Sequence, residues 1–257
     1  MLFLGGTLAG ALGGLLGIGG GIVLMPMLRF FVGLSPAHAA GTCILAVFFT
    51  TLGGTYRHYK LGNVNIRSIV PIIISGAIST IIFSFVFLYM SRQECWLDLA
   101  FGIVFSLISL RMIAEGIPGL VKKKENEMAG NEIKGILGQK VSIGTLAGAL
   151  PGLLGIGTGV ILVPAFTYIL SMPIKVAMAS SLTCFSVNAL ISSGFKYCQG
   201  FIDLNVALAI CLGTLVGANL GAMLNKRFSS RTLKLVFGFA FSYVSIKFIL
   251  SYMETRI

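Results

Sequence analysis

Long runs of apolar residues, separated by short polar stretches, dominate the chain. A helix that crosses the hydrocarbon core of a bilayer needs about 20 predominantly apolar residues. This pattern predicts an all-α integral membrane protein with eight hydrophobic segments. The uncharged runs that define the segments are 2–28, 37–56, 68–91, 99–110, 141–174, 176–195, 204–225 and 235–246.

Composition agrees with this prediction. Hydrophobic residues make up 56% of the 257 residues, charged residues make up 11%, and the mean hydropathy is +0.95. A soluble domain carries about 25% charged residues, so a water-soluble fold is excluded. The net charge of +11 comes from basic residues that stand singly between apolar segments, as in cytoplasmic loop ends. We therefore expect a multi-pass protein of the cell membrane, in contact with the lipid bilayer, and no binding of nucleic acid.

The chain contains an internal repeat. At an offset of 138 residues, TLAGALGGLLGIGGGIVLMP (7–26) aligns with TLAGALPGLLGIGTGVILVP (145–164), and 15 of these 20 positions are identical. The match continues weakly, and at an offset of 136 Phe101-Gly102 aligns with Phe237-Gly238. We therefore divide the chain into a first four-segment repeat (1–117), a basic cytoplasmic linker (118–140) and a second four-segment repeat (141–257).

The first segment of each half is too long for one span and is interrupted by glycines. Glycine costs about 1 kcal/mol relative to alanine in a helix interior, and proline costs about 3 kcal/mol. We therefore expect the chain to unwind where a glycine cluster is followed by a proline. The clusters are Gly17, Gly19, Gly20 and Gly21 before Pro26, and Gly155, Gly157 and Gly159 before Pro164.

Two interpretations of the glycine clusters remain. Small residues allow membrane helices to pack closely. Alternatively, the unwound backbone lines a cavity, and its free N–H groups bind a negative group together with the N-terminus of the half-helix at Ile22 or Val160. The clusters occupy equivalent positions in both halves, which favours a binding site.

With these motifs, the sequence resembles the sulfite exporter TauE/SafE family. The resemblance rests on GIGGGIVLMP followed by AAGTC (39–43) and on GIGTGVILVP followed by AMASS (177–181), and it covers essentially the whole chain. It implies two four-segment halves that move sulfite, sulfonates or related small organic anions. Thr158 and Pro151 stand where the first half has Gly20 and Gly13, so we expect the two half-sites to differ.

Hydroxyl, thiol and amide groups provide further candidate donors. Thr42-Cys43 and Ser180-Ser181 occupy equivalent places in the two halves; they can donate to anion oxygens or bond to their own helix carbonyls. Asn188 is a candidate cavity donor, although hydrogen bonding between helices is the commoner use of such a residue. The predicted substrate-binding set is Gly17, Gly19, Gly20, Gly21, Thr42, Cys43, His58, Gly155, Gly157, Thr158, Gly159, Ser180, Ser181 and Asn188.

Charged residues allow two interpretations. His58 ends the second segment and Lys196 aligns with it, so both snorkelling to the interface and attraction of an anion remain open. All acidic residues lie in or beside predicted loops, so we expect no buried carboxylate relay and an anion held mainly by neutral donors. His38 and His58 are the only histidines, too few for a metal site, and no cofactor is expected.

The distribution of basic residues favours one topology. If all eight segments cross, 12 basic residues lie on the side of the linker and 7 on the other side. If segments 2–34 and 141–174 fold back as re-entrant hairpins, the division becomes 14 to 5, which the positive-inside rule prefers. Each half then has three spans, so the halves have inverted topologies, an arrangement that suits alternating access.

Three functional classes remain to be compared. An intramembrane enzyme is the weakest, because the chain has no G-x-S-x-G, no H-E-x-x-H and no paired carboxylates within spans. The repeat favours a transporter with a site at the repeat interface. We therefore expect alternating-access transport of sulfite, a sulfonate or a related organosulfur or carboxylate anion. An anion channel or pore remains the alternative.

Overall fold

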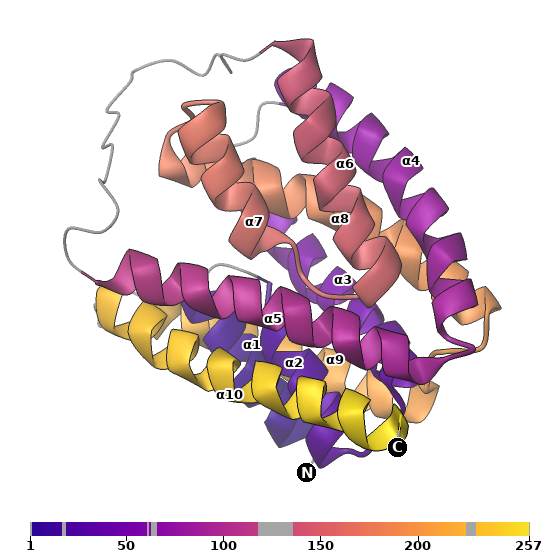
Figure 1. The fold of residues 1–257 in the computed structure, drawn as a ribbon. Coiled ribbons are helices and arrows are strands. Elements are labelled where there is room, and N and C mark those ends of the chain that lie inside the picture. The colour runs from indigo at the N-terminus through magenta and orange to yellow at the C-terminus, as the bar shows by residue number, and fades with distance from the viewer. Residues whose placement is uncertain are drawn as a thin grey trace.

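The computed structural model describes residues 2–16, 19–60, 62, 66–117, 136–224 and 230–256, and all regular elements in these ranges are helices (Figure 1). Two short π-helices, η1 (Met27–Phe31) and η2 (Ala165–Ile169), continue α2 and α7. The α-helices are α1 (Leu2–Leu16), α2 (Gly21–Pro26), α3 (Pro36–Lys60), α4 (Ile66–Met90), α5 (Glu94–Gly116), α6 (Leu137–Leu154), α7 (Gly159–Pro164), α8 (Ile174–Cys198), α9 (Leu204–Leu224) and α10 (Ser230–Arg256).

Five of the described helices, α3, α4, α5, α8 and α10, are long and apolar enough to cross a membrane. Shorter apolar helices cover Leu2–Gly13, Gly21–Phe31 and Leu204–Ala218. Many large apolar side chains, such as Ile78, Leu107 and Leu212, are exposed on the outside of the bundle, as expected of a surface that meets lipid. The predicted class, an all-α integral membrane protein, is therefore confirmed.

Some helices extend beyond the apolar runs. α5 begins at Glu94 instead of near residue 99, and α6 begins at Leu137, so the end of the predicted linker is helical. At that helix end, the Ile136 N–H donates to the side-chain oxygen of Gln139 at 3.3 Å. This bond satisfies a backbone donor that would otherwise be free and stabilises the first turn of α6.

The helix breaks lie at the glycines. α1 ends at Leu16 and α2 begins at Gly21, while α6 ends at Leu154 and α7 begins at Gly159. Gly19, Gly20 and Gly155 have φ angles of +82°, +74° and +65°, a region that glycine reaches without steric cost. The chain unwinds at the glycine clusters, as predicted, whereas Pro26 and Pro164 lie inside helical segments that widen into η1 and η2. The missing proline N–H therefore changes the helix type without ending the helix.

The chain reverses direction at both breaks. In the first half, Gly20 lies against Ala9 and Gly13, and Met27 lies against Gly5 near the start of α1. In the second half, Ile143 of α6 packs in one apolar cluster with Leu162 and Phe166 of the α7–η2 segment. Residues 2–16 and 19–31 thus form a folded-back pair, here called hairpin 1, and residues 137–169 form hairpin 2.

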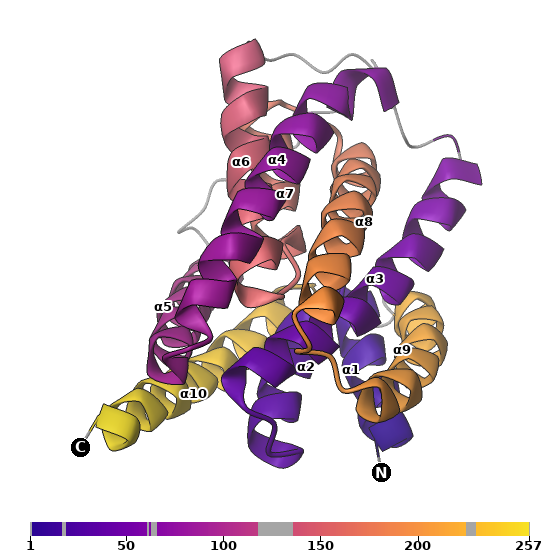
Figure 2. The ribbon, with the colours of Figure 1, turned by 90° about the vertical axis from the view of Figure 1, so that its right-hand side faces the viewer.

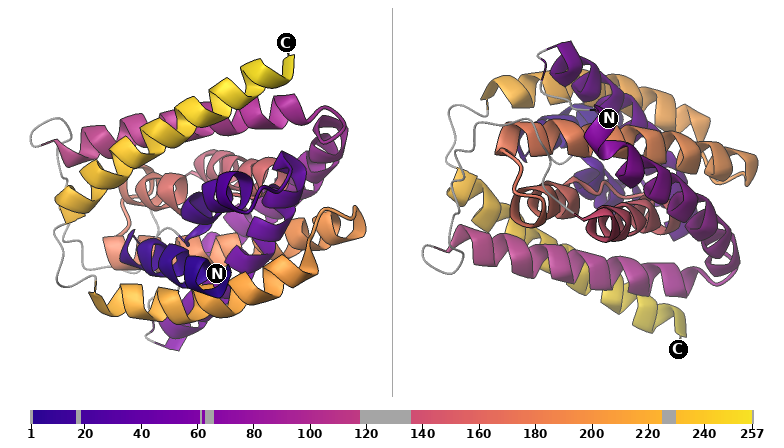
Figure 3. Two further views of the ribbon diagram at one scale, coloured as in Figure 1. Left: turned by 90° about the horizontal axis from the view of Figure 1, so that it is seen from below. Right: turned by 90° about the horizontal axis from the view of Figure 1, so that it is seen from above.

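Helices at aligned positions pack in matching ways. α1 runs parallel to α9, with Gly6 against Ile210 and Gly10 against Thr214. α6 runs parallel to α4, with Gly144 against Ile72. α5 and α10 lie antiparallel along one flank (Figure 3), and α3 and α8 cross in the interior. Each hairpin therefore packs on a helix of the other half of the chain.

The two hairpins enter the bundle from opposite ends. α3 and α9 begin at the same end, because Gly41 contacts Phe201 just before α9, and α1 is parallel to α9. α4 begins where α3 finishes, and α6 is parallel to α4. Figure 2 accordingly shows α1 and α2 near the chain termini and α6 at the opposite end. We call these the terminal end and the linker end.

Candidate functional site

The two glycine breaks meet inside the bundle. A Cβ atom placed on Gly21 would lie 2.8 Å from the Gly157 nitrogen and 2.9 Å from Cγ2 of Val47. No side chain fits there without moving the opposite loop. The sequence pattern predicted that each glycine cluster lines a site; the structure brings the two clusters into direct backbone contact.

α3 and α8 enclose the meeting point. The Cβ position of Gly19 lies 3.3 Å from the Thr51 methyl and 3.8 Å from the Phe185 ring. The Cys43 thiol donates to the carbonyl oxygen of Gly21 at 3.4 Å. On the other loop, Gly155 packs against the Ala40 carbonyl. These side chains are buried, so the site is enclosed by packed walls.

The predicted hydroxyl donors differ in whether they already have a hydrogen-bond partner. Thr42 already accepts a hydrogen bond from the Asp203 N–H at 3.2 Å. Thr158 and Ser180 are fully buried, and their hydroxyl groups have no hydrogen-bond partner. Ser181 is buried as well. A buried unpaired hydroxyl costs about 1–3 kcal/mol, so Thr158, which lies in the loop itself, is a donor that a bound anion would satisfy.

Four further predicted positions are Asn188, Gly17, His58 and Gly159. Asn188 donates to the Ala147 carbonyl at 3.4 Å, which is the bond between helices considered as its alternative role, and its own amide oxygen has no partner. Gly17 and the side chain of His58 lie outside the described residues. Gly159, the first residue of α7, is buried.

Lys196 is a buried cation that sequence reasoning did not place in the site. Its ammonium group donates to the carbonyls of Pro151 at 3.1 Å and Gly152 at 2.7 Å, and to the Ser192 hydroxyl at 3.0 Å. It also lies 4.3 Å from the Phe87 ring centroid. With 0% exposure, Lys196 does not snorkel to the interface. It instead caps the last turn of α6, where carbonyl groups carry the negative end of the helix dipole.

One acidic residue beside a loop is buried, which the sequence did not predict. Asp98 lies in α5 with 1% exposure. It accepts hydrogen bonds from Arg29 at 2.8 Å and from Ser251 at 2.9 Å. Arg29, far away in sequence, pairs with the buried carboxylate and offsets the cost of removing its charge from water.

The chain is similar to membrane proteins of a known family. Residues 2–248 match the family described as Sulfite exporter TauE/SafE. The chain is 29% identical to Probable membrane transporter protein YunE of Bacillus subtilis (strain 168), with 90% of each chain covered. It is 30% identical to a Probable membrane transporter protein of Xylella fastidiosa (strain 9a5c), with 94% of this chain and 91% of the relative covered. No solved structure gives a significant match.

Proposed function

The chain belongs to the sulfite exporter TauE/SafE family, and we propose that it transports a small anion by alternating access, binding it where the two glycine loops meet. The observation that carries this proposal is the contact of Gly21 with Gly157 beside the unpartnered hydroxyl of Thr158. Irregular backbone at membrane depth is tolerated where it lines a cavity or is buried in protein, and loops of this kind form transporter substrate sites.

The charges around the loops favour an anion. The helical segments 21–31 and 159–169 both begin at the loops, so the positive ends of their dipoles face the meeting point. Lys196 offsets the carbonyl end of α6 at Pro151 and Gly152. The substrate is thus held mainly by neutral donors and helix N-termini. Such a site releases its cargo without leaving a strong ion pair to break.

The directions of the helices support the inverted arrangement. We infer that each half contributes three crossings and one re-entrant hairpin, with hairpin 1 entering from the terminal end and hairpin 2 from the linker end. The bias of 14 to 5 in basic residues then places the linker end in the cytoplasm. Rocking of one half against the other around α3 and α8 would expose the loops alternately to the two sides.

Uptake into proteoliposomes tests this function. Labelled sulfite, alkanesulfonates and small carboxylates are offered to vesicles that contain the purified protein. Saturable uptake is expected, together with a clear loss in Thr158→Val. Thr145→Val is the matched control, because its hydroxyl is exposed and donates to the Val141 carbonyl of its own helix. Movement of only neutral solutes or cations would refute the proposal.

Counterflow distinguishes a transporter from a channel. Vesicles loaded with unlabelled anion should accumulate labelled anion transiently, because a carrier exchanges substrate through an occluded site. An anion channel would show neither accumulation nor saturation, and that result would replace alternating access with a pore.

A further inference from the structure

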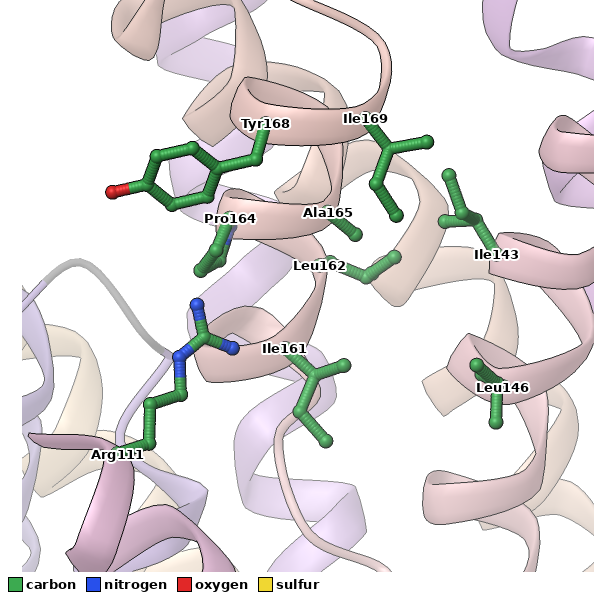
Figure 4. Close-up of a pocket in the computed structure, with 9 residues that line it drawn as sticks. All are labelled: Arg111, Ile143, Leu146, Ile161, Leu162, Pro164, Ala165, Tyr168 and Ile169. Carbon is green, nitrogen blue, oxygen red and sulfur yellow. The ribbon is translucent and has the colours of Figure 1, made fainter. Parts of the chain in front are cut away.

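A pocket of about 310 Å³ lies between α5, α6 and the α7–η2 segment. Ile143 and Leu146 line one side, and residues from Ile161 to Ile169 line the other. Among the described residues of the lining, Arg111 of α5 alone carries a charge (Figure 4). The volume corresponds to about ten water molecules, enough for a small organic molecule.

The pocket runs along α7 toward the glycine loop. It extends from Tyr168 in η2 to Ile161 in the first turns of α7, and the Ile161 N–H donates to the Thr158 carbonyl at 2.9 Å. In Figure 4 the Arg111 guanidinium is directed toward Pro164 and Ile161, while the Tyr168 hydroxyl points away. A molecule in the pocket would therefore lie beside the helix that leads to Thr158.

The aligned place in the first half is filled. At the offset of 138, Met27 aligns with Ala165 and Gly5 with Ile143. The Met27 sulfur lies 2.8 Å from the Cβ position of Gly5, so the Met27 side chain closes the gap between the two arms of hairpin 1. Hairpin 2 reverses the sizes at these two positions, because the short Ala165 lies opposite the larger Ile143. The pocket lies beside this pair.

The cations at the two aligned places also differ in surroundings. Lys247 aligns with Arg111 at the offset of 136, and its ammonium group lies 5.5 Å from the ring centroid of Phe30. Phe30 in turn packs on Phe248 with the ring centroids 4.7 Å apart. Beside hairpin 1, the cation Lys247 is therefore covered by rings, whereas beside hairpin 2 Arg111 borders open space.

Arg111 belongs to a cluster with excess positive charge. Glu115 accepts from Arg111 at 2.9 Å and from Lys234 at 2.7 Å. Among the described side chains of this cluster, one carboxylate thus serves two cations, which leaves about one positive charge at the end of an apolar pocket. This combination matches an anion with an apolar part, because a bare inorganic oxyanion would lose its hydration in the apolar lining without compensation.

We propose that this pocket binds an organic anion, with its negative group at Arg111 and its apolar group along Ile161 and Ala165. This proposal rests on the proposed function only in that the bound anion would be substrate loaded from the linker end. Binding itself is measurable without transport, so the two proposals fail separately.

Calorimetric titration of the protein in lipid nanodiscs tests the pocket, with empty nanodiscs as the blank. The probes are straight-chain alkanesulfonates from methane- to hexanesulfonate. In the unmodified protein the Kd should fall by up to about fourfold per added methylene. Ala165→Met, which copies Met27, should abolish this dependence. Arg111→Gln should raise the Kd of every probe about tenfold and leave the dependence on chain length unchanged. The matched Lys247→Gln should change neither the Kd nor its dependence on chain length.

Three results would overturn the proposal. They are a Kd in the unmodified protein that does not depend on chain length, a dependence that survives in Ala165→Met, and equal effects of Arg111→Gln and Lys247→Gln. If Ala165→Met does not fold, Ala165→Leu replaces it. Native mass spectrometry shows whether a phospholipid binds the unmodified protein but not Ala165→Met. If it does, and the Kd for alkanesulfonates does not depend on chain length, the pocket binds lipid instead. If the protein transports sulfite but its Kd for alkanesulfonates does not change with chain length, the pocket proposal is rejected and the proposed transport function stands.

Discussion

Arg29 and Asp98 form an ion pair that ties hairpin 1 to α5, with 2.8 Å between Nη2 of Arg29 and Oδ2 of Asp98. Thr167 aligns with Arg29, and Lys234 aligns with Asp98. Lys234 pairs with Glu115 inside the α5–α10 pair, and within the described residues no ion pair joins hairpin 2 to α5 or α10. The two hairpins are therefore attached to the same helix pair in different ways.

Loss of this ion pair should destabilise the protein. Asp98→Asn leaves Arg29 without its carboxylate, and because Arg29 is partly exposed we expect a loss of about 1–3 kcal/mol, less than for a fully buried pair. Thermal unfolding in detergent measures the effect, with the exposed Glu94→Gln as control. Arg29→Gln added to Asp98→Asn should cost little more, since the two residues act together. Full additivity would contradict a shared interaction.

The contact between the loops predicts extreme sensitivity to added side chains. Gly21→Ala places a methyl group 2.8 Å from the Gly157 nitrogen, so we expect flux to fall at least about tenfold. Gly19→Leu and Gly157→Leu should abolish it. All three variants should still reach the membrane. Gly194→Ala is the matched control, because its Cβ position meets nothing within 4 Å. Normal flux in both Gly19→Leu and Gly157→Leu would show that the loops do not form the substrate site.

Lys196→Met should weaken anion binding. The substitution removes the cation that offsets the carbonyls of Pro151 and Gly152, so the negative end of α6 acts on the site unopposed. We expect an affinity loss of about tenfold, since a charge at a helix end is worth up to about 2 kcal/mol in a partly buried setting. Lys60→Met, at an exposed lysine, should bind normally. Lys196→Met with unchanged affinity would reduce Lys196 to a purely structural residue.

The inverted arrangement predicts a labelling pattern. Cysteines placed at Ser35 and Lys175, which follow hairpins 1 and 2, should react with a membrane-impermeant reagent from opposite faces of the membrane. The background needs Cys95→Ser and Cys198→Ser, because Cys198 is exposed and Cys95 is partly so. Reaction of both cysteines from one face would show that the halves are parallel.

The sequence predicted the features that depend on local physics. The helix breaks follow from glycines whose positive φ angles and low helix propensity act within a few residues. The alignment of GIGGG with GIGTG predicted that both breaks matter, but not that Gly21 and Gly157 touch. That contact depends on hairpins entering from opposite ends, which only the charge count indicated.

The features missed depend on partners far away in sequence. A lysine at the end of an apolar run is ordinary at an interface, and only the carbonyls released at the α6 break make a buried position favourable for Lys196. The burial of Asp98 could not be predicted, because its partner Arg29 is 69 residues away in sequence. Thr42 accepts a hydrogen bond from the Asp203 N–H, and the sequence did not reveal this partner, which is 161 residues away.

The parallel packing of α1 on α9 has a consequence for biosynthesis. Gly6 and Gly10 of α1 rest against Ile210 and Thr214, residues that the ribosome adds much later. At about 5–20 residues per second, the first hairpin waits roughly 10–40 s for the helix that covers it. During that interval its glycine-lined surface faces lipid or the insertion machinery. Newly made chains truncated before α9 should therefore hold hairpin 1 unassembled, however complete the first half of the protein is.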